Sequence, residues 1–74
     1  MASFKLDLSG LKCPLPVLRT RKALKSMQPG DRLDVVCTDP LAAIDLPHLI
    51  SETGDRIEIL KQDIESIHFL IEKR

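Results

Sequence analysis

The side chains in this chain that could serve as nucleophiles or metal ligands centre on two cysteines and two histidines. Cys13 lies in the segment GLKCPLPVLRTRKAL, residues 10–24, whereas Cys37, His48 and His68 are scattered over the remainder. The spacings contain no paired C-x-x-C or H-x-x-x-H cluster, so they do not favour a metal site. The chemistry that the sequence indicates is that of a free thiol, and Cys13 is the candidate.

The residues around Cys13 predict a reactive cysteine at the start of a helix. We expect Cys13 at the N-cap, Pro14 at the first helical position and Pro16 within the first turn, where a missing N–H costs little. Sulfur is a poor capping acceptor compared with the side-chain oxygens usually found there, so helix stability does not explain the cysteine. A helix N-terminus and the adjacent Lys12 should instead lower the thiol pKa. The alternative is a small apolar residue packed under the strand–helix turn.

Charge is unevenly distributed along the chain. Eleven basic and eleven acidic residues balance, but the stretch from Leu8 to Gly30 contains five basic residues and no acid, and ten of the acids follow Gly30. This distribution predicts one local positive face around the thiol, suited to docking acidic partner surfaces. A solvated helix face is the alternative. The residues assigned to the docking face are Lys12, Arg19, Arg21 and Lys22.

Composition narrows the class of protein. The chain has 74 residues, of which 43% are hydrophobic and 30% charged, which predicts a single small globular domain spanning residues 1–74. The N-terminus lacks a secretory signal and no apolar run approaches the ~20 residues of a membrane helix, so we expect a cytoplasmic protein with reduced thiols and no membrane contact. The only aromatic residues, Phe4 and Phe69, fit the core, which leaves no stacking platform for direct nucleic-acid binding. We expect no cofactor and a monomer.

Hydrophobic periodicity predicts the elements that position the cysteine. Alternation indicates strands, a stripe at helical spacing indicates the first helix, and Pro29-Gly30 should end that helix. Asp39 should cap the second helix with Pro40 at its first position, Thr53 near its end, and a kink or break at Pro47. The expected order is strand 4–8, helix from 14, strand 32–38, helix 40–53, strand 56–61 and strand 66–73.

This β-α-β-α-β-β order predicts an α/β (α+β) two-layer sandwich. Strands joined through a helix are usually parallel, and the four-residue link 62–65 suits an antiparallel hairpin. The sheet should therefore be four-stranded and mixed, with the two helices on one face and the other face open. We expect Val36, Leu60 and Leu70 on that open face.

The second cysteine has a structural interpretation. Cys37 is in phase with Leu33 and Val35, which predicts a buried strand residue. If the first two strands are parallel, Cys37 also ends near the same sheet edge as Cys13, so a resolving role stays open. Asp39 is read as a helix cap and Asp45 as a surface acid or a support for the Pro47 kink; neither is assigned to catalysis.

The segment Cys-Pro-x-Pro after Gly-Leu at the start of the first helix resembles the signature of the TusA/SirA-like sulfur carrier family. The segments "MQPGD", "TDP" and "DLP" extend the resemblance over residues 4–72. It implies that Cys13 carries sulfur as a persulfide, with Gly10, Pro14 and Pro16 supporting the motif. It also implies a cysteine desulfurase or other sulfurtransferase as donor and a cysteine protein as acceptor, for example in tRNA thiolation. The protein would then be a relay rather than a stand-alone turnover enzyme.

Two other classes of function remain open from the residues alone. One is a non-catalytic interaction or regulatory module that uses the open sheet face. The other is a thiol redox protein that uses Cys13 and Cys37, which requires their Cα atoms to lie within ~7 Å.

Overall fold

A computed structural model describes residues 2–74. Its element order confirms the predicted β-α-β-α-β-β pattern, and the strands and helices lie within two residues of most of their predicted bounds. The elements are β1 (Ser3–Leu8), α1 (Leu15–Lys25), β2 (Arg32–Cys37), α2 (Ala42–Thr53), β3 (Arg56–Gln62) and β4 (Ile67–Glu72).

The four strands form one mixed sheet in the order β1-β2-β4-β3. β1 and β2 run parallel, with Leu8 paired to Cys37, so the two strands end at the same edge of the sheet. β4 pairs antiparallel with both β2 and β3. The parallel pair therefore delivers the loop after β1 and the loop after β2 to neighbouring positions.

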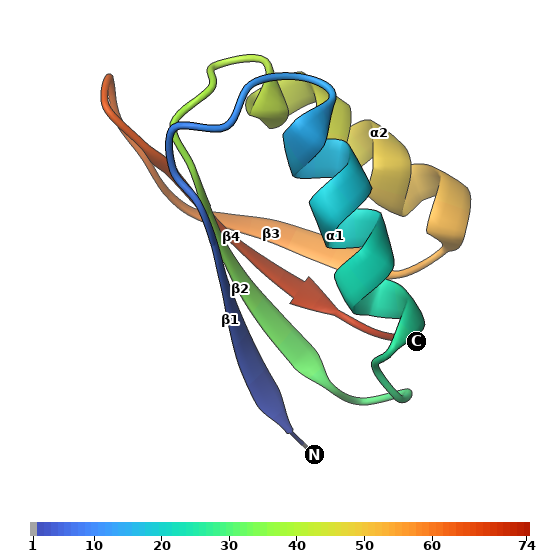
Figure 1. Cartoon of the computed structure of the whole chain (residues 1–74). Coiled ribbons are helices and arrows are strands. Elements are labelled where there is room, and N and C mark those ends of the chain that lie inside the picture. Colours follow the sequence, from blue (N-terminus) through green and yellow to red (C-terminus); the bar gives the residue numbers. More distant parts are fainter. Residues whose placement is uncertain (1) are drawn as a thin grey trace.

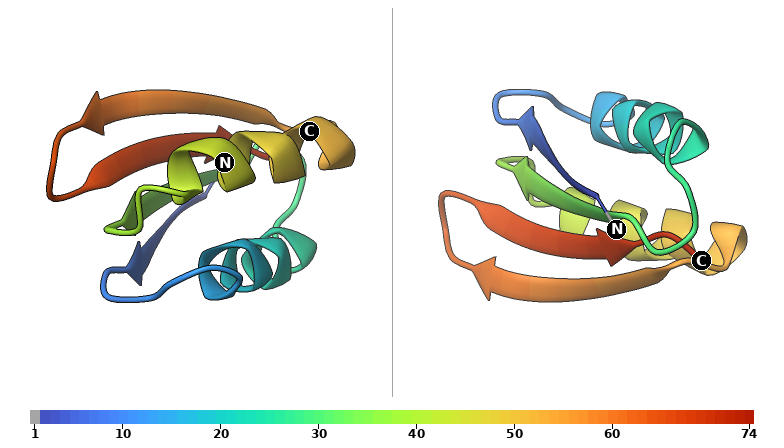
Figure 2. Two further views of the ribbon diagram at one scale, coloured as in Figure 1. Left: turned by 90° about the horizontal axis from the view of Figure 1, so that it is seen from above. Right: turned by 90° about the horizontal axis from the view of Figure 1, so that it is seen from below.

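Both helices pack against the same face of the sheet, as predicted (Figure 1). The views from above and below show α1 alongside β1 and α2 toward β3, with the helices next to each other (Figure 2). The core lies between the two layers, where Phe69, Leu46 and Ile71 are completely buried. Cys37 is part of this core, as its phase in the strand predicted.

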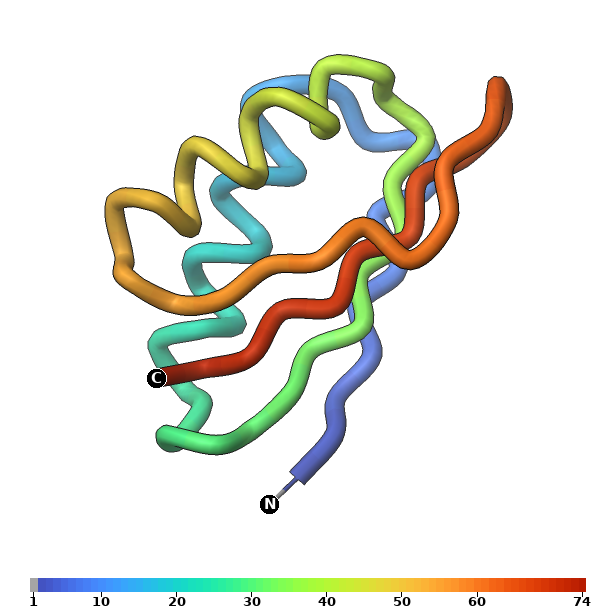
Figure 3. Tube along the Cα trace, turned by 180° about the vertical axis from the view of Figure 1, so that it is seen from behind, coloured from blue at the N-terminus to red at the C-terminus, as the bar shows by residue number. Residues whose placement is uncertain are grey.

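The opposite face of the sheet is open, and its edge at β3 is irregular. Leu60 is 55% exposed there, while Val36 and Leu70 are half-buried. A β-bulge between Ile59 and Lys61 inserts Leu60 as an extra residue opposite β4. Viewed from behind, the turn of the β3–β4 hairpin projects beyond the rest of the sheet (Figure 3).

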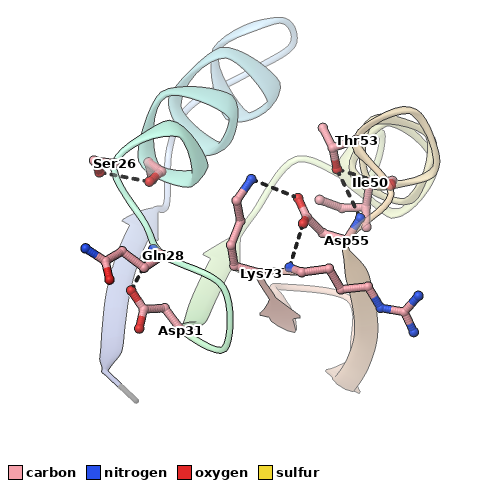
Figure 4. Close-up of polar contacts among 9 residues, drawn as sticks. Ser26, Gln28, Asp31, Ile50, Thr53, Asp55 and Lys73 are labelled. Atoms are coloured by element: carbon pink, nitrogen blue, oxygen red, sulfur yellow. Dashed lines mark hydrogen bonds and ion pairs between the residues drawn. The ribbon is translucent and has the colours of Figure 1, made fainter.

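A group of polar contacts fastens the chain at the end of α2 (Figure 4). Gly54 ends the helix in the left-handed conformation, with φ 82°, which favours glycine. Asp55 follows with only 1% of its side chain exposed; its Oδ1 accepts the Arg74 N–H at 2.9 Å, and its Oδ2 lies 3.8 Å from Lys73 Nζ. These contacts hold the C-terminal residues against the α2–β3 connection.

The helices begin one or two residues later than predicted. α1 starts at Leu15, so Pro14 is its N-cap and Cys13 precedes the cap; the expected N-cap position of Cys13 is wrong. α2 starts at Ala42 with Leu41 as N-cap, so Asp39 is not the cap residue. In each case a short turn precedes the helix, with the Leu15 N–H bonded to the Lys12 carbonyl and the Ala42 N–H to the Asp39 carbonyl.

The structure bears on two further expectations. Of the kink or break expected at Pro47, the break is wrong: α2 runs through Pro47 as one helix, because the loss of one backbone hydrogen bond is outweighed by the burial of Leu46, Leu49 and Ile50 on either side of it. Phe4 is not a core residue, since 44% of it is exposed near the start of the edge strand β1.

Candidate functional site: the Cys13 loop

Cys13 lies exposed in the loop that joins β1 to α1. Gly10 makes the turn after β1 with φ +80°, a conformation in which other residues are strained. Its N–H donates a 2.7 Å hydrogen bond to Thr38 Oγ1, in the loop after β2. The loop is thus attached to the neighbouring strand end before it reaches the cysteine.

Asp39 fixes the backbone of Cys13 itself. The Cys13 N–H donates a 2.8 Å hydrogen bond to Asp39 Oδ2, while Oδ1 accepts the Leu41 N–H at 3.1 Å. These two bonds, the one from Cys13 foremost, hold the pKa of the Asp39 carboxyl below its usual range. One carboxylate therefore connects the cysteine loop to the approach to α2.

The two motif prolines stiffen the chain between the cysteine and α1. Pro14 is the exposed N-cap residue, and the Cys13–Pro14 peptide bond is cis. Pro16 is the second helical residue and is buried, so its expected position in the first turn is confirmed. Neither proline removes an N–H that the helix would use, because first-turn donors have no intrahelical partner.

The thiol opens onto a shallow groove of about 260 Å³ between α1 and α2. The Asp45 carboxylate, from the first turn of α2, lines this groove together with the Cys13 thiol. The complete lining is Cys13, Pro14, Val17, Arg21, Asp45, His48, Leu49 and Glu52.

The surroundings of Cys13 raise the pKa of its thiol. The interaction of the thiol proton with the nearby Asp45 carboxylate is the largest cause, followed by partial desolvation and by the negative charges of Asp45 and Asp39. The expectation of a lowered pKa is wrong in direction. It assumed that Cys13 caps the helix next to Lys12, whereas two carboxylates from the second half of the chain interact with the thiol more strongly.

One of the predicted docking residues, Arg21, also lines the groove. Arg21 points toward α2, where its guanidinium lies 4.0 Å from the Glu52 carboxylate, and His48 Nε2 lies 3.1 Å from the other Glu52 oxygen. Lys12, Arg19 and Lys22 are exposed. The role of these three residues and of Arg21 in docking stays a prediction.

Cys37 is a poor candidate for chemistry. It is 0% exposed, and burial, with a smaller effect of Asp39, raises the pKa of its thiol to about 11. Both cysteines are free thiols. Within residues 2–74 no group of three or more His, Cys, Asp or Glu side chains is placed to hold a metal ion.

Asp39 and Asp45 are the site residues that sequence reasoning missed, because both lie far from Cys13 along the chain. The signal that could have found them was present. "TDP" contains Asp39 and "DLP" contains Asp45, and these short segments accompanied the cysteine motif in the family resemblance.

Comparisons with known proteins agree on one family. A family model described as sulfurtransferase TusA matches residues 4–73. The sulfur carrier protein TusA of Allochromatium vinosum is 43% identical over 75 residues, which cover 99% of each chain. The crystal structure of a SirA-like protein from Desulfitobacterium hafniense superposes with a TM-score of 0.80 at 27% identity, covering 93% of this chain and 95% of that one. None of the helices in the described part of the chain is long and apolar enough to cross a membrane.

Proposed function

We propose that this chain, which belongs to the TusA family, is a sulfur carrier that holds sulfane sulfur as a persulfide on Cys13. The observation that carries the proposal is the position of the thiol. Cys13 is exposed, yet its backbone is held by Asp39 and by the prolines that follow it. A carrier needs such a sulfur, which a second protein can reach without a conformational change in the carrier.

The loading step requires only the Cys13 thiol and a donor persulfide. The Cys13 thiol loses its proton, and the resulting thiolate attacks the outer sulfur of a donor persulfide. A new S–S bond forms between Cys13 and that outer sulfur, and the S–S bond of the donor breaks. The sulfur of the donor cysteine leaves as a thiolate, which takes up a proton. Delivery repeats the step with the acceptor cysteine as nucleophile, so no external oxidant or reductant is needed.

The partners follow from this chemistry. The donor is a cysteine desulfurase or another sulfurtransferase that bears a persulfide, and the acceptor is a second cysteine protein, for example in a pathway that thiolates tRNA. Both reactions suit a cytoplasmic monomer whose cysteines stay reduced. Direct contact with nucleic acid is not part of the proposal, since Phe69 is buried and Phe4, the one exposed aromatic side chain, cannot form a stacking platform by itself.

The exposed basic residues of the α1 region are the proposed docking surface. Lys12, Arg19 and Lys22 lie near or beyond the cysteine, where complementary acidic groups on a partner would raise the association rate more than the lifetime of the complex. Short-lived complexes suit a carrier that must bind two partners in turn.

Intact mass spectrometry tests the proposal. The reduced protein is incubated with a cysteine desulfurase and cysteine, and its mass is then measured before and after treatment with a reductant. The native protein and Cys37→Ala should gain one sulfur that the reductant removes, and Cys13→Ser should gain none. Sulfur uptake by Cys13→Ser would contradict the assignment of Cys13, and an internal disulfide in the native protein would favour the redox alternative.

A further inference from the structure

The groove beside Cys13 contains several ionisable side chains, although the sulfur transfer proposed above requires only the thiol itself. Four of them line it together with the cysteine: Arg21 from α1, and Asp45, His48 and Glu52 from α2. The three on α2 are spaced at i, i+3 and i+7, which places them along one side of that helix. The groove therefore presents a row of ionisable groups that leads from the cysteine along α2.

Within this row Glu52 pairs with the two basic side chains, and Asp45 is the charged side chain that remains beside the cysteine. Glu52 contacts both basic side chains of the groove, with His48 Nε2 at 3.1 Å from one carboxylate oxygen and Arg21 at 4.0 Å from the other. Asp45 lies in the first turn of α2, at the Cys13 end of the row, and lines the groove beside the thiol. The residue best placed to influence the sulfur is thus a carboxylate, while the nearby positive charge of Arg21 is directed to Glu52.

The other charged groups near the sulfur do not make its surroundings positive. Asp39, from the loop after β2, adds a second negative charge close to Cys13. Lys12 is adjacent in sequence, but it acts on the Asp39 carboxyl, whose pKa it helps to lower. A thiol that lies close to two carboxylates is stabilised as S–H and destabilised as S⁻.

We propose that Asp45 keeps Cys13 protonated and unreactive while the carrier is free, and that a sulfur-exchange partner activates it by placing a cationic side chain in the groove. The inference rests on the proposed function and specifies the partner surface: acidic where it meets the exposed basic residues of α1, but basic where it approaches the thiol. A cation beside Asp45 neutralises the carboxylate, weakens its hold on the thiol proton and lets that proton pass to solvent. The thiolate then forms only where a sulfur donor or acceptor is present.

The first test measures the alkylation rate of unloaded protein by iodoacetamide across a pH series, because the rate follows the thiolate fraction. Cys13→Ser supplies the blank for Cys37. Asp45→Asn removes the charge with little change of shape and should lower the midpoint of the pH profile. Alkylation near neutral pH should then be about tenfold faster for every whole pH value by which the midpoint falls. Glu58→Gln, which removes the same charge from an exposed position on β3, should leave the midpoint where it is. An unchanged midpoint in Asp45→Asn overturns the proposal.

The second test asks which charge the groove accepts. Two methanethiosulfonate reagents, one bearing a trimethylammonium group and one a sulfonate, are compared on the native protein and normalised to their rates with free cysteine. The native protein should favour the cationic reagent, and this preference should fall in Asp45→Asn but persist in Glu58→Gln. A native preference for the anionic reagent would mean that the basic residues control access to Cys13, which overturns the proposal.

These measurements separate the inference from the proposed function. Neither requires a persulfide or a partner protein, so a failure to form the persulfide leaves them interpretable. Far-ultraviolet circular dichroism checks that Asp45→Asn is folded, with Asp45→Ser as a second variant. The reagent comparison on the native protein needs no variant and can overturn the proposal alone.

Discussion

Asp39 binds the Cys13 amide at 2.8 Å across 26 positions of sequence, and this contact joins the loop after β1 to the loop after β2. Parallel pairing of the two strands makes it geometrically possible, because both strands end at the same edge. The cysteine is consequently positioned by the sheet as well as by the helix that follows it.

Replacing Asp39 by Ala should loosen the cysteine loop. The amides of Cys13 and Leu41 lose their acceptor and should exchange with solvent deuterium severalfold faster, as measured by NMR hydrogen exchange. Amides of β4 should keep their protection, and Glu58→Ala should change neither region. Unchanged exchange at Cys13 would mean that the prolines alone hold the loop.

Stability should fall at acid pH through carboxylates that accept backbone hydrogen bonds. Such bonds are the main cause that lowers the pKa values of Asp31, Asp39 and Asp63 in the folded protein, and the pKa of Asp7 is lowered first by the Ser9 side chain and then by the Ser9 backbone N–H. A lowered folded pKa gives stability that is complete above the unfolded value of ~3.9 and is lost as pH falls through the folded value. Urea unfolding across an acid pH series measures this loss, and Asp39→Asn should show a shallower decline. An equal decline in that variant would remove Asp39 from the set.

Cys37 should be inert in the folded protein. With its thiol buried and its pKa raised to about 11, a maleimide at neutral pH should label only Cys13, whereas urea should expose both thiols. Cys37→Ala should keep sulfur loading and lose about 1 kcal/mol of unfolding free energy, the order expected for removal of one small buried group. Double labelling without urea would contradict the buried position.

Breaking the ion pair of Asp55 should destabilise the C-terminal attachment. Lys73→Met would leave Asp55 Oδ2, which has no hydrogen-bond partner among residues 2–74, buried without its cation. We expect a loss of about 1–3 kcal/mol in urea unfolding, the usual cost of an unpaired buried polar group. The double variant Lys73→Met/Asp55→Asn should recover part of it. A single variant as stable as the native protein would show that solvent reaches Asp55.

Reversing the charge of Arg19 and Lys22 to Glu should slow sulfur transfer from a loaded donor. These exposed residues should speed association, so added salt should slow the native protein more than the variant. Transfer rates across a salt series measure the effect, and the midpoint of Cys13 alkylation should not move. Equal, salt-independent rates would mean that the two residues belong to a solvated helix face.

Local sequence signals predicted much of this structure. Periodicity predicted the four strands and two helices, and the double proline and Gly-Leu marked Cys13 as the exposed thiol. The helix starts shifted by one or two residues because backbone turns, closed by the carbonyls of Lys12 and Asp39, occupy the positions where caps were expected.

The electrostatics of Cys13 could not be predicted from neighbours in sequence. Lys12 and the helix start suggested a lowered pKa, while the groups that raise it come from α2 and the loop before it. Only the packing of α1 against α2 and the parallel pairing of β1 with β2 bring them to the sulfur. Local motifs thus identified the thiol, but the direction in which its pKa moves depended on tertiary contacts.

The bulge at Leu60 also affects how molecules meet one another. A regular edge strand exposes a continuous row of amide and carbonyl groups to which an edge of a second molecule can add, the first step of sheet polymerisation. In β3 the extra residue breaks the spacing of that row, and exposed Arg56, Glu58 and Lys61 put charge along the same strand. The hairpin that completes the sheet thereby disfavours extension of the sheet from its β3 edge into a second molecule.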